Sequence, residues 1–397
     1  MTSVDSTRGE EVVPGPSTGT TEPGTPSSTF IIKIAGACNL NCTYCYVYNL
    51  GDTTYESRPK VMSKAVAGAA LDRIFEYARS NDLPYVGLAL HGGEPTLVGK
   101  RWMAWFLDEV ARRASGGPLA TLSVQTNGTE LDGDWLDIFA EHKVSIGISI
   151  DGPEAWHDQF RVNHAGRGSY RKVRQAIELL AADPRGLPWG TLTVANPDYP
   201  GTRIFSHLAE LGVRNMDFLW PDHHHDMRPP WPAGALSRYY IELFDAWLDA
   251  MNPDIKIRWF ATVIEMLLGS TPRIDAIGLQ SIAEVVVEAD GSLEPLDVLR
   301  VCSNGMTQMG LNVTRNSIDE LRSTRLFSQG LRSAELLPAD CLECPVLNVC
   351  GGGYLPHRWG NGRGFRNPSV HSGELRRTIE HIRDRVAAEF AAASARD

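Results

Sequence analysis

Short β-rich runs alternate with amphipathic helical stretches along the first half of the sequence, and this alternation constrains the fold more than any other feature. The strands expected from it are Phe30–Ile34, Val86–His91, Leu119–Gln125, Val144–Ile150, Thr191–Val194 and Met216–Leu219. The helices expected between them are Ser63–Asn81, Arg101–Ala114, Asp134–His142, Tyr170–Ala182 and Thr202–Leu211. Repeated strand-then-helix units predict an α/β fold with parallel strands, here a partial (β/α)6 barrel. Functional side chains are then expected at the carboxyl ends of the strands.

The chain divides by composition into a sequence of regions. We expect a disordered tail rich in Ser, Thr, Gly and Pro (1–28), the barrel (29–220), a helical bridging region (221–280), a Cys- and Gly-rich region (281–375) and a C-terminal helix (376–397). The later regions are predicted to contain helices over Leu236–Met251 and Trp259–Leu268, a hairpin of Ala283–Val287 with Ser292–Glu294, and a last helix near Glu374–Ala392.

Charge and hydropathy exclude some classes of partner. The 397 residues carry a formal net charge of -10, which argues against a nucleic-acid partner because phosphate binding needs a basic face. No apolar run reaches the roughly 18 to 20 residues of a membrane helix, and no signal pattern opens the chain. We expect a cytoplasmic protein without a membrane partner.

The cysteines are distributed unevenly. Three lie near the start and four near the end, with none between Cys45 and Cys302: Cys38, Cys42 and Cys45, then Cys302, Cys341, Cys344 and Cys350. They are too few for a disulfide scaffold in a chain of this length, and scattered buried thiols would be spread more evenly. The clustering indicates metal binding.

The first cluster, Cys38, Cys42 and Cys45, has the spacing C-x3-C-x2-C and follows the first expected strand directly. A [4Fe–4S] cluster takes four thiolates, so a loop that supplies three leaves one iron open to another ligand. A structural zinc would close its site with four protein ligands, and no further Cys or His lies close by in the sequence. Zinc is therefore the weaker interpretation.

This loop resembles the cluster-binding motif of the radical S-adenosylmethionine (SAM) superfamily, whose open iron chelates the amine and carboxylate of SAM. Gly92, Gly93 and Glu94, after the second strand, are similar to the superfamily's glycine-rich motif. There glycine permits close backbone approach, and Glu94 or a backbone carbonyl accepts a hydrogen bond from the SAM ammonium.

Further strand ends carry matching residues. Ser149 and Asp151 are similar to the contact with the ribose and carboxylate of SAM in the peptide-modifying branch, and Arg161 matches the arginine that pairs with the carboxylate. The resemblance also implies SAM contacts from Tyr44, Thr126, Asn127 and Thr193. Each motif alone also fits a turn, a loop or a solvated charge. Their order at successive strand ends favours a ligand site.

The second cluster resembles the SPASM extension of radical SAM maturases, which holds auxiliary iron–sulfur clusters. Cys341, Cys344 and Cys350 give C-x2-C-x5-C. Other cysteines of the full pattern are absent: Leu296, Tyr354 and Ser372 stand in their places. Cys302 completes a set of four, so we predict one auxiliary [4Fe–4S] cluster on Cys302, Cys341, Cys344 and Cys350, with a structural zinc on the same thiolates as the alternative.

The resemblance implies a reaction sequence. An electron from an external donor such as flavodoxin or ferredoxin cleaves SAM to a 5′-deoxyadenosyl radical, which abstracts hydrogen from a substrate carbon. Asp297 resembles the aspartate near the substrate in sulfatase-maturating relatives and is the predicted proton acceptor, with a surface carboxylate as the alternative. We interpret His223–His225 as a solvated loop over the barrel mouth rather than a metal site.

The segments Cys350–Trp359 and Asn367–Val370 resemble the cyclophane-forming SPASM maturases, which join an aromatic ring carbon to a side-chain Cβ of a ribosomal precursor peptide. Thioether or ether crosslinking, epimerisation, oxidation and methylation stay open as other radical SAM outcomes. A peptide leader would bind the barrel and C-terminal region, a sheet edge or a separate partner protein. An alternative from another class of protein is a non-catalytic iron–sulfur or zinc protein. Such a protein would not need the residues that resemble SAM-binding motifs.

Overall fold

The computed structural model describes residues 26–272 and 274–394, in which the strands form a single mixed sheet. Its order is β10-β9-β8-β1-β2-β3-β4-β5-β6-β7. The strands are β1 (Thr29–Ala35), β2 (Tyr85–Gly92), β3 (Leu119–Thr126), β4 (Ser145–Ser149), β5 (Trp189–Val194), β6 (Asn215–Leu219), β7 (Lys256–Ile257), β8 (Val285–Val287), β9 (Ser292–Glu294) and β10 (Leu311–Asn312). Neighbours from β8 through β1 to β7 pair in parallel, and β9 and β10 pair antiparallel.

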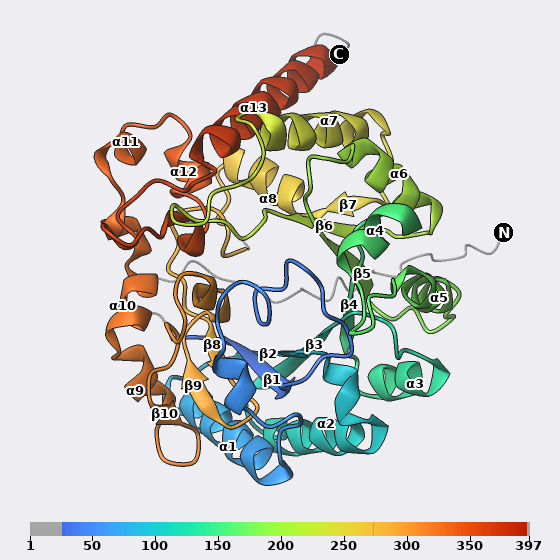
Figure 1. Ribbon diagram of the computed structural model, residues 1–397, viewed down its shortest axis with the longest axis vertical. Coiled ribbons are helices and arrows are strands. Elements are labelled where there is room, and N and C mark those ends of the chain that lie inside the picture. The colour runs from blue at the N-terminus through green and yellow to red at the C-terminus, as the bar shows by residue number, and fades with distance from the viewer. Residues whose placement is uncertain (1–25, 273, 395–397) are drawn as a thin grey trace, which may run out of the picture.

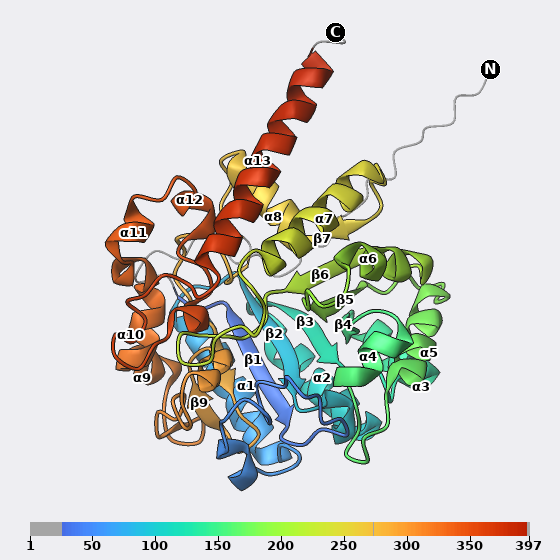
Figure 2. The ribbon, with the colours of Figure 1, turned by 45° about the horizontal axis from the view of Figure 1, so that its top comes forward.

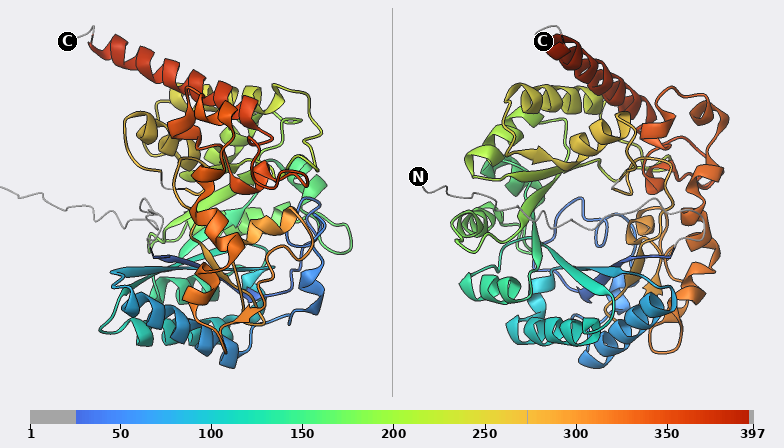
Figure 3. Two further views of the ribbon diagram at one scale, coloured as in Figure 1. Left: turned by 90° about the vertical axis from the view of Figure 1, so that its left-hand side faces the viewer. Right: turned by 180° about the vertical axis from the view of Figure 1, so that it is seen from behind.

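The prediction of a partial α/β barrel is confirmed, and the expected strands are all present. The barrel sheet is wider than predicted because β7 adds to β6 at one edge and β8 adds to β1 at the other. β7 is too short to show a periodic pattern in the sequence. β8 was expected only as half of a hairpin, and it carries that hairpin onto the barrel. Figure 3 shows the strands curving around an open interior.

Helices cover the outside of the curved sheet, as Figures 1 and 2 show. They are α1 (Lys64–Ser80), α2 (Lys100–Ala114), α3 (Gly133–Glu141), α4 (Glu154–Phe160), α5 (Tyr170–Ala181), α6 (Gly201–Glu210), α7 (Ala235–Asp249), α8 (Arg258–Leu267) and α13 (Ser372–Ser394). Short helices α9 (Ile318–Arg322), α10 (Arg325–Leu331), α11 (Ala339–Leu342) and α12 (Leu347–Cys350) run along one side of the barrel. Single 3-10 turns are η1 (Thr54–Ser57), η2 (Pro95–Val98), η3 (Asp297–Val301), η4 (Ser333–Leu336) and η5 (Leu355–Arg358).

The helices keep an apolar stripe against the sheet, as their periodicity predicts. In α1 the side chains of Leu71, Ile74 and Phe75 are fully buried in the main core, together with Phe30 and Ile32 of β1. Burying each such side chain stabilises the fold by about 1.5–3 kcal/mol. This packing fixes the strands, whose carboxyl ends then form a rigid rim.

The last residues of the predicted tail 1–28 contact the barrel. Residues 1–25 lie outside the described part of the chain, but Ser27 and Ser28 are held against the barrel. The Ser27 amide donates to the Tyr77 hydroxyl at 2.9 Å, and the Ser28 carbonyl accepts from the Gly87 amide at 2.7 Å. These two contacts hold Ser27 and Ser28 against α1 and β2, within the stretch predicted as a tail. Within the described ranges, none of the helices combines the length and apolarity needed to span a bilayer.

A buried ion-pair network joins the C-terminal region to the barrel. Arg300 on η3 is fully buried and pairs with Glu288 at 2.6 Å and Glu294 at 3.1 Å. Arg58, from the segment after β1, pairs with the same two carboxylates. Lys33 of β1 pairs with Asp297 at 2.5 Å. The network therefore ties η3 and the β8–β9 hairpin to β1.

Replacing Arg300 with Leu is expected to lower the free energy of unfolding by about 3–5 kcal/mol, because Glu288 and Glu294 would lose a partner while staying buried. Urea unfolding under anaerobic conditions measures it. Arg332→Leu is the matched control, since Arg332 pairs with Glu335 on the surface with both side chains more than half exposed. It should change stability by less than about 0.5 kcal/mol. Equal effects from the two variants would contradict this account of the network.

Candidate active site

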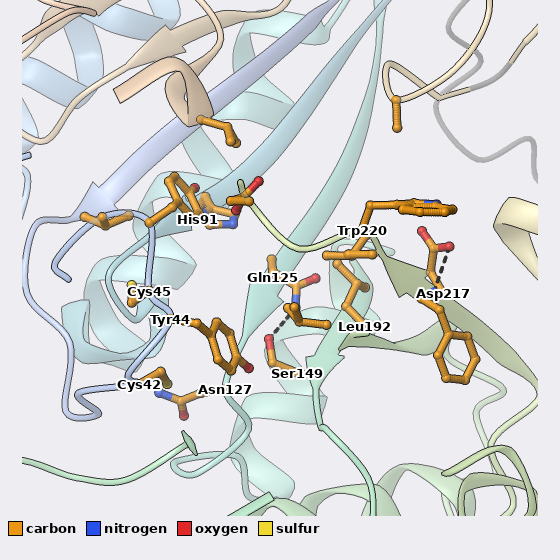
Figure 4. Close-up of a pocket in the computed structure, with 18 of the residues that line it drawn as sticks. Cys42, Tyr44, Cys45, His91, Gln125, Asn127, Ser149, Leu192, Asp217 and Trp220 are labelled. Carbon is orange, nitrogen blue, oxygen red and sulfur yellow. Dashed lines mark hydrogen bonds between the residues drawn. The ribbon is translucent and has the colours of Figure 1, made fainter. Parts of the chain in front are cut away.

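One cavity opens at the carboxyl ends of β2 to β6, with about 1560 Å³ of space not filled by atoms. The predicted residues on its wall are Cys38, Cys42, Tyr44, Cys45, Gly92, Gly93, Thr126, Asn127, Ser149 and Arg161. Figure 4 shows Cys42, Tyr44 and Cys45 on one side of the cavity and Asp217 and Trp220 on the other. The structure thus brings together residues that the sequence distributes over more than 120 positions.

The loop after β1 presents all three predicted thiols to this cavity. Backbone bonds hold the loop in place: the Asn41 amide donates to the Val162 carbonyl at 2.7 Å, and the Thr43 amide to the Phe160 carbonyl at 2.9 Å. Burial raises the pKa of Cys38 to about 12 and raises that of Cys42. Cationic iron supplies the charge that would offset this burial and keep such thiols as thiolates.

The glycine pair at the end of β2 lies where no larger residue fits. A Cβ on Gly93 would stand 2.1 Å from the Tyr48 hydroxyl and 2.2 Å from the Ala37 carbonyl oxygen. A Cβ on Gly92 would stand 2.1 Å from the Ala35 carbonyl oxygen. The Gly93 amide donates a hydrogen bond to the Ala35 carbonyl at 2.8 Å, which holds the end of β2 close to the end of β1. The result is a narrow cradle of backbone beside the thiols.

Glu94 does not line the cavity. One carboxylate oxygen accepts from the Thr126 and Thr96 hydroxyls at 2.6 Å each, and the other accepts from the Asn127 amide at 2.7 Å. Both oxygens are thus occupied within the protein. The predicted ammonium contact therefore falls to the backbone of the glycine pair, and Glu94 ties the end of β2 to the end of β3. Asn127 continues the link by donating to Asn39 at 2.8 Å.

Tyr44, Asp151 and Arg161 form a buried polar group beside the thiols. The Tyr44 hydroxyl donates to the Asp151 carboxylate and accepts from Arg161 Nη1, the latter at 2.8 Å. Arg161 is 8% exposed, and its Nε has no hydrogen-bond partner. Asp151 lies on the wall of an adjoining cavity instead, where its other oxygen accepts from the Val194 amide at 3.3 Å.

These observations test whether the residues fit the implied cofactors. A buried guanidinium with an unused N–H on the wall suits an anionic group such as the SAM carboxylate. Gly92 and Gly93 line the same cavity as the three thiols. The residues fit a three-thiolate [4Fe–4S] cluster with SAM beside it.

Thr193 does not line the cavity. It is fully buried, its hydroxyl donates to the Ile150 carbonyl at 2.6 Å, and it lies on neither cavity wall. Successive strand residues face opposite sides, so Leu192 and Val194 line the cavity in its place. Gln125, which donates to Ser149 at 2.9 Å, and His91 also line it and were missed. Side chains alternate between the two faces of a strand. One known cavity-facing residue on β3 and one on β2 would therefore have been enough to predict Gln125 and His91.

Asp297 is not on the cavity wall. Its carboxylate pairs with Lys33 at 2.5 Å and accepts from the Tyr46 hydroxyl at 2.6 Å. Although burial acts the other way, the charges of Lys33 and Arg300 hold the pKa of this carboxyl well below its usual range. A carboxylate stabilised so strongly in its ionised form is a poor proton acceptor, so the placement does not support the predicted catalytic role.

The C-terminal thiols separate into two sets. The charges of Cys341 and Cys344 act on Cys350, so these three lie near one another. Cys302 packs instead in a second apolar cluster with Leu355 and Phe365, its Sγ 3.9 Å from the Pro356 carbonyl oxygen. The structure therefore brings together three of the four predicted auxiliary ligands.

The histidine run is not a solvated loop. His224 is 5% exposed and its Nε2 lies 3.0 Å from the Val301 carbonyl oxygen, while His225 Nε2 lies 2.8 Å from the Pro368 carbonyl oxygen. These bonds pin the segment after β6 to the C-terminal region. In the part of the chain that the structure describes, no three His, Cys, Asp or Glu side chains are grouped to hold a single metal ion.

Comparisons with known proteins agree with this geometry. Residues 32–192 match the family model of the radical SAM superfamily. The chain is 30% identical over 312 residues to a cysteine-type anaerobic sulfatase-maturating enzyme of Clostridium novyi, covering 74% of this chain and 82% of the relative. It is 25% identical over 353 residues to a serine-type anaerobic sulfatase-maturating enzyme of Bacteroides thetaiotaomicron, covering 82% of each.

Two solved structures share the fold. The structure of anSMEcpe with bound AdoMet superimposes with a TM-score of 0.78 at 22% identity, covering 91% of this chain and 98% of that one. SuiB of Streptococcus suis bound to its precursor peptide SuiA gives 0.61 at 15% identity, covering 87% and 76%.

The barrel and its three-thiol cavity define an enzyme that uses SAM and a [4Fe–4S] cluster for radical chemistry. The chain belongs to the radical SAM superfamily, and it is a peptide- or protein-modifying member of it.

Arg161→Lys is expected to raise the Kd for SAM about tenfold to hundredfold, because an ammonium lacks the planar fork of the guanidinium. Equilibrium binding to the anaerobically reconstituted protein measures it. Arg171→Lys is the control, as Arg171 is 87% exposed on α5. If the two variants bind SAM equally well, Arg161 is not a SAM ligand.

Proposed function

We propose that this protein is a maturase that forms a cyclophane, joining an aromatic ring carbon to a side-chain Cβ of a ribosomal precursor peptide. The observation that carries the proposal is the composition of the cavity wall opposite the thiols. It includes several aromatic side chains, with Trp220 after the end of β6, Trp259 on α8, and Tyr354 and His357 from the C-terminal region.

An aromatic wall suits an aromatic substrate side chain. Trp220 stacks on Tyr240 with ring centroids 4.3 Å apart, and Trp259 lies 5.8 Å from Trp220, so these rings are fixed in position. Offset or edge contacts between rings add about 0.5–1.5 kcal/mol to burial. Tyr354 and His357 belong to the segment that resembles the cyclophane-forming enzymes, and both line the cavity.

The chain's own residues bind and position the reactants. Cys38, Cys42 and Cys45 would hold the cluster, and Arg161 and the Gly92–Gly93 backbone would hold SAM. When bound, the cluster and SAM supply a 5′-deoxyadenosyl radical that abstracts hydrogen from carbon. The aromatic part of the wall would shield that carbon from water and limit side reactions.

The C-terminal thiols would hold an auxiliary [4Fe–4S] cluster. Cys341, Cys344 and Cys350 lie together, which supports three of the four ligands. Cys302 stays the candidate for the fourth, at the cost of a rearrangement that brings its loop out of the second apolar cluster.

Three further features belong to the proposal. We place the enzyme in the cytoplasm, where a flavodoxin or ferredoxin would supply the electron. The precursor's leader would bind the barrel and C-terminal region directly.

A second function has specific support. The 30% identical relative is a sulfatase-maturating enzyme of the cysteine type, so oxidation of a single Cys or Ser side chain to an aldehyde is the alternative. That reaction needs no aromatic substrate residue, and it would leave the aromatic wall without a role in recognition.

The test is anaerobic incubation with SAM, dithionite and precursor peptides that carry an aromatic three-residue motif. We expect 5′-deoxyadenosine and a peptide lighter by two hydrogen atoms, with no fragmentation between the aromatic residue and its crosslinked partner. Replacing the aromatic residue with Ala should remove the product. A hydrazine-reactive aldehyde would instead establish the sulfatase-type reaction, and S-adenosylhomocysteine would establish methylation.

A further inference from the structure

The proposed function requires a group that accepts a proton, and this inference rests on that function. In ring-to-Cβ crosslinking one hydrogen atom leaves Cβ for the 5′-deoxyadenosyl radical, and the carbon radical then bonds to the ring. To restore aromaticity the ring must lose one electron and one proton. An oxidised iron–sulfur cluster held by the protein's thiols would accept the electron. The proton needs a base on the cavity wall.

The wall carries three carboxylates, those of Asp217, Asp222 and Asp275. Asp217 is paired with Arg258, with Nε at 2.7 Å and Nη2 at 2.5 Å. Asp275 is hydrogen-bonded to Tyr354 and also lies in the field of Arg258. Both are therefore engaged with neighbouring protein groups.

Asp222 differs from these two. Its side chain is 25% exposed, and it lies on the wall shared by the main cavity and the adjoining one. Its nearest ion-pairing group is His357 Nε2, at 3.9 Å from its Oδ1. That Nε2 is buried without a hydrogen-bond partner. Among residues 26–272 and 274–394, no arginine or lysine forms an ion pair with Asp222, and its partly exposed carboxylate lies near one imidazole.

The segment that carries Asp222 is held on both sides. His371 Nε2 lies 3.1 Å from the Pro221 carbonyl oxygen just before it, and His224 Nε2 lies 3.0 Å from the Val301 carbonyl oxygen just after it. His357 packs edge-on against His371 at 4.8 Å. These contacts fix the backbone on either side of Asp222, which limits where its carboxylate can lie relative to a bound substrate.

We propose that Asp222 is the base that accepts the proton from the substrate radical, with His357 as the residue that positions its carboxylate. Asp297 keeps the structural role that its ion pair with Lys33 gives it.

The protonation state of Asp222 agrees with this assignment. Burial, with the negative charges of Asp297 and Asp275, raises its pKa to about 7. The other titratable groups that face it are His223 on its own segment, His357 and Tyr354 at η5, and Cys302 after η3. A base must be ionised before it accepts a proton. The fraction of enzyme with an ionised Asp222, and with it the rate of crosslinking, should therefore increase as the pH rises through about 7.

The test compares Asp222→Asn with Asp297→Asn in the full enzyme, reconstituted with iron and supplied with precursor peptide. For Asp222→Asn we expect 5′-deoxyadenosine at a rate near that of the wild type, with the ratio of modified peptide to 5′-deoxyadenosine lowered about a hundredfold or more. Asp198→Asn, at an exposed position after β5, is the control and should keep the wild-type ratio.

Two results would overturn the proposal. One is a wild-type ratio of modified peptide to 5′-deoxyadenosine for Asp222→Asn. The other is a stably folded Asp297→Asn that lowers this ratio while Asp222→Asn does not. If Asp222→Asn does not fold, the pH profile of the wild type decides, since the ratio must rise with pH through about 7 and a flat ratio refutes the base. Aldehyde formation also releases a proton, so the product's identity tests the proposed function and the ratio tests Asp222.

Discussion

The Glu94 carboxylate joins the loops on which the rest of the site depends. It binds the Thr126 hydroxyl and the Asn127 amide at the end of β3, while its own amide donates to Ala37 beside Cys38 at 2.9 Å. Three strand ends are thereby fixed relative to one another before any cofactor binds. Burial raises the pKa of Glu94, and its four hydrogen bonds act in the opposite sense, so a buried acceptor is satisfied without a cation. The backbone and this carboxylate therefore hold the three strand ends in place.

The sequence predicts those parts of the fold and site that depend on residues close together in the chain. Strand alternation and helix periodicity give the barrel, and the spacing of Cys38, Cys42 and Cys45 gives the cluster loop, because each depends on neighbours a few positions away. Thr193 was misplaced because motif resemblance identifies a strand end but not which face its residues take. Asp297 was misjudged because its partner, Lys33, lies on β1 far away in the sequence. Pairing between distant charges leaves no periodic signal.

The C-terminal region does more than carry cysteines. Its ion pair with Lys33 of β1 and its contacts with His224 and His225 after β6 link the two sides of the barrel sheet. This link brings Tyr354 and His357 onto the cavity wall opposite the thiols. The buried ion pairs of Lys33 and Arg300 therefore stabilise the fold and hold the C-terminal region beside the cavity. This double role offsets the free-energy cost of removing charged groups from water.

Electron paramagnetic resonance of the dithionite-reduced, anaerobically reconstituted protein tests the central claim most directly. The account predicts a [4Fe–4S] signal that changes when SAM is added, and that loses this response when Cys38, Cys42 and Cys45 are all replaced by Ala. A triple variant whose signal still responds to SAM, and which still forms 5′-deoxyadenosine, would contradict the account.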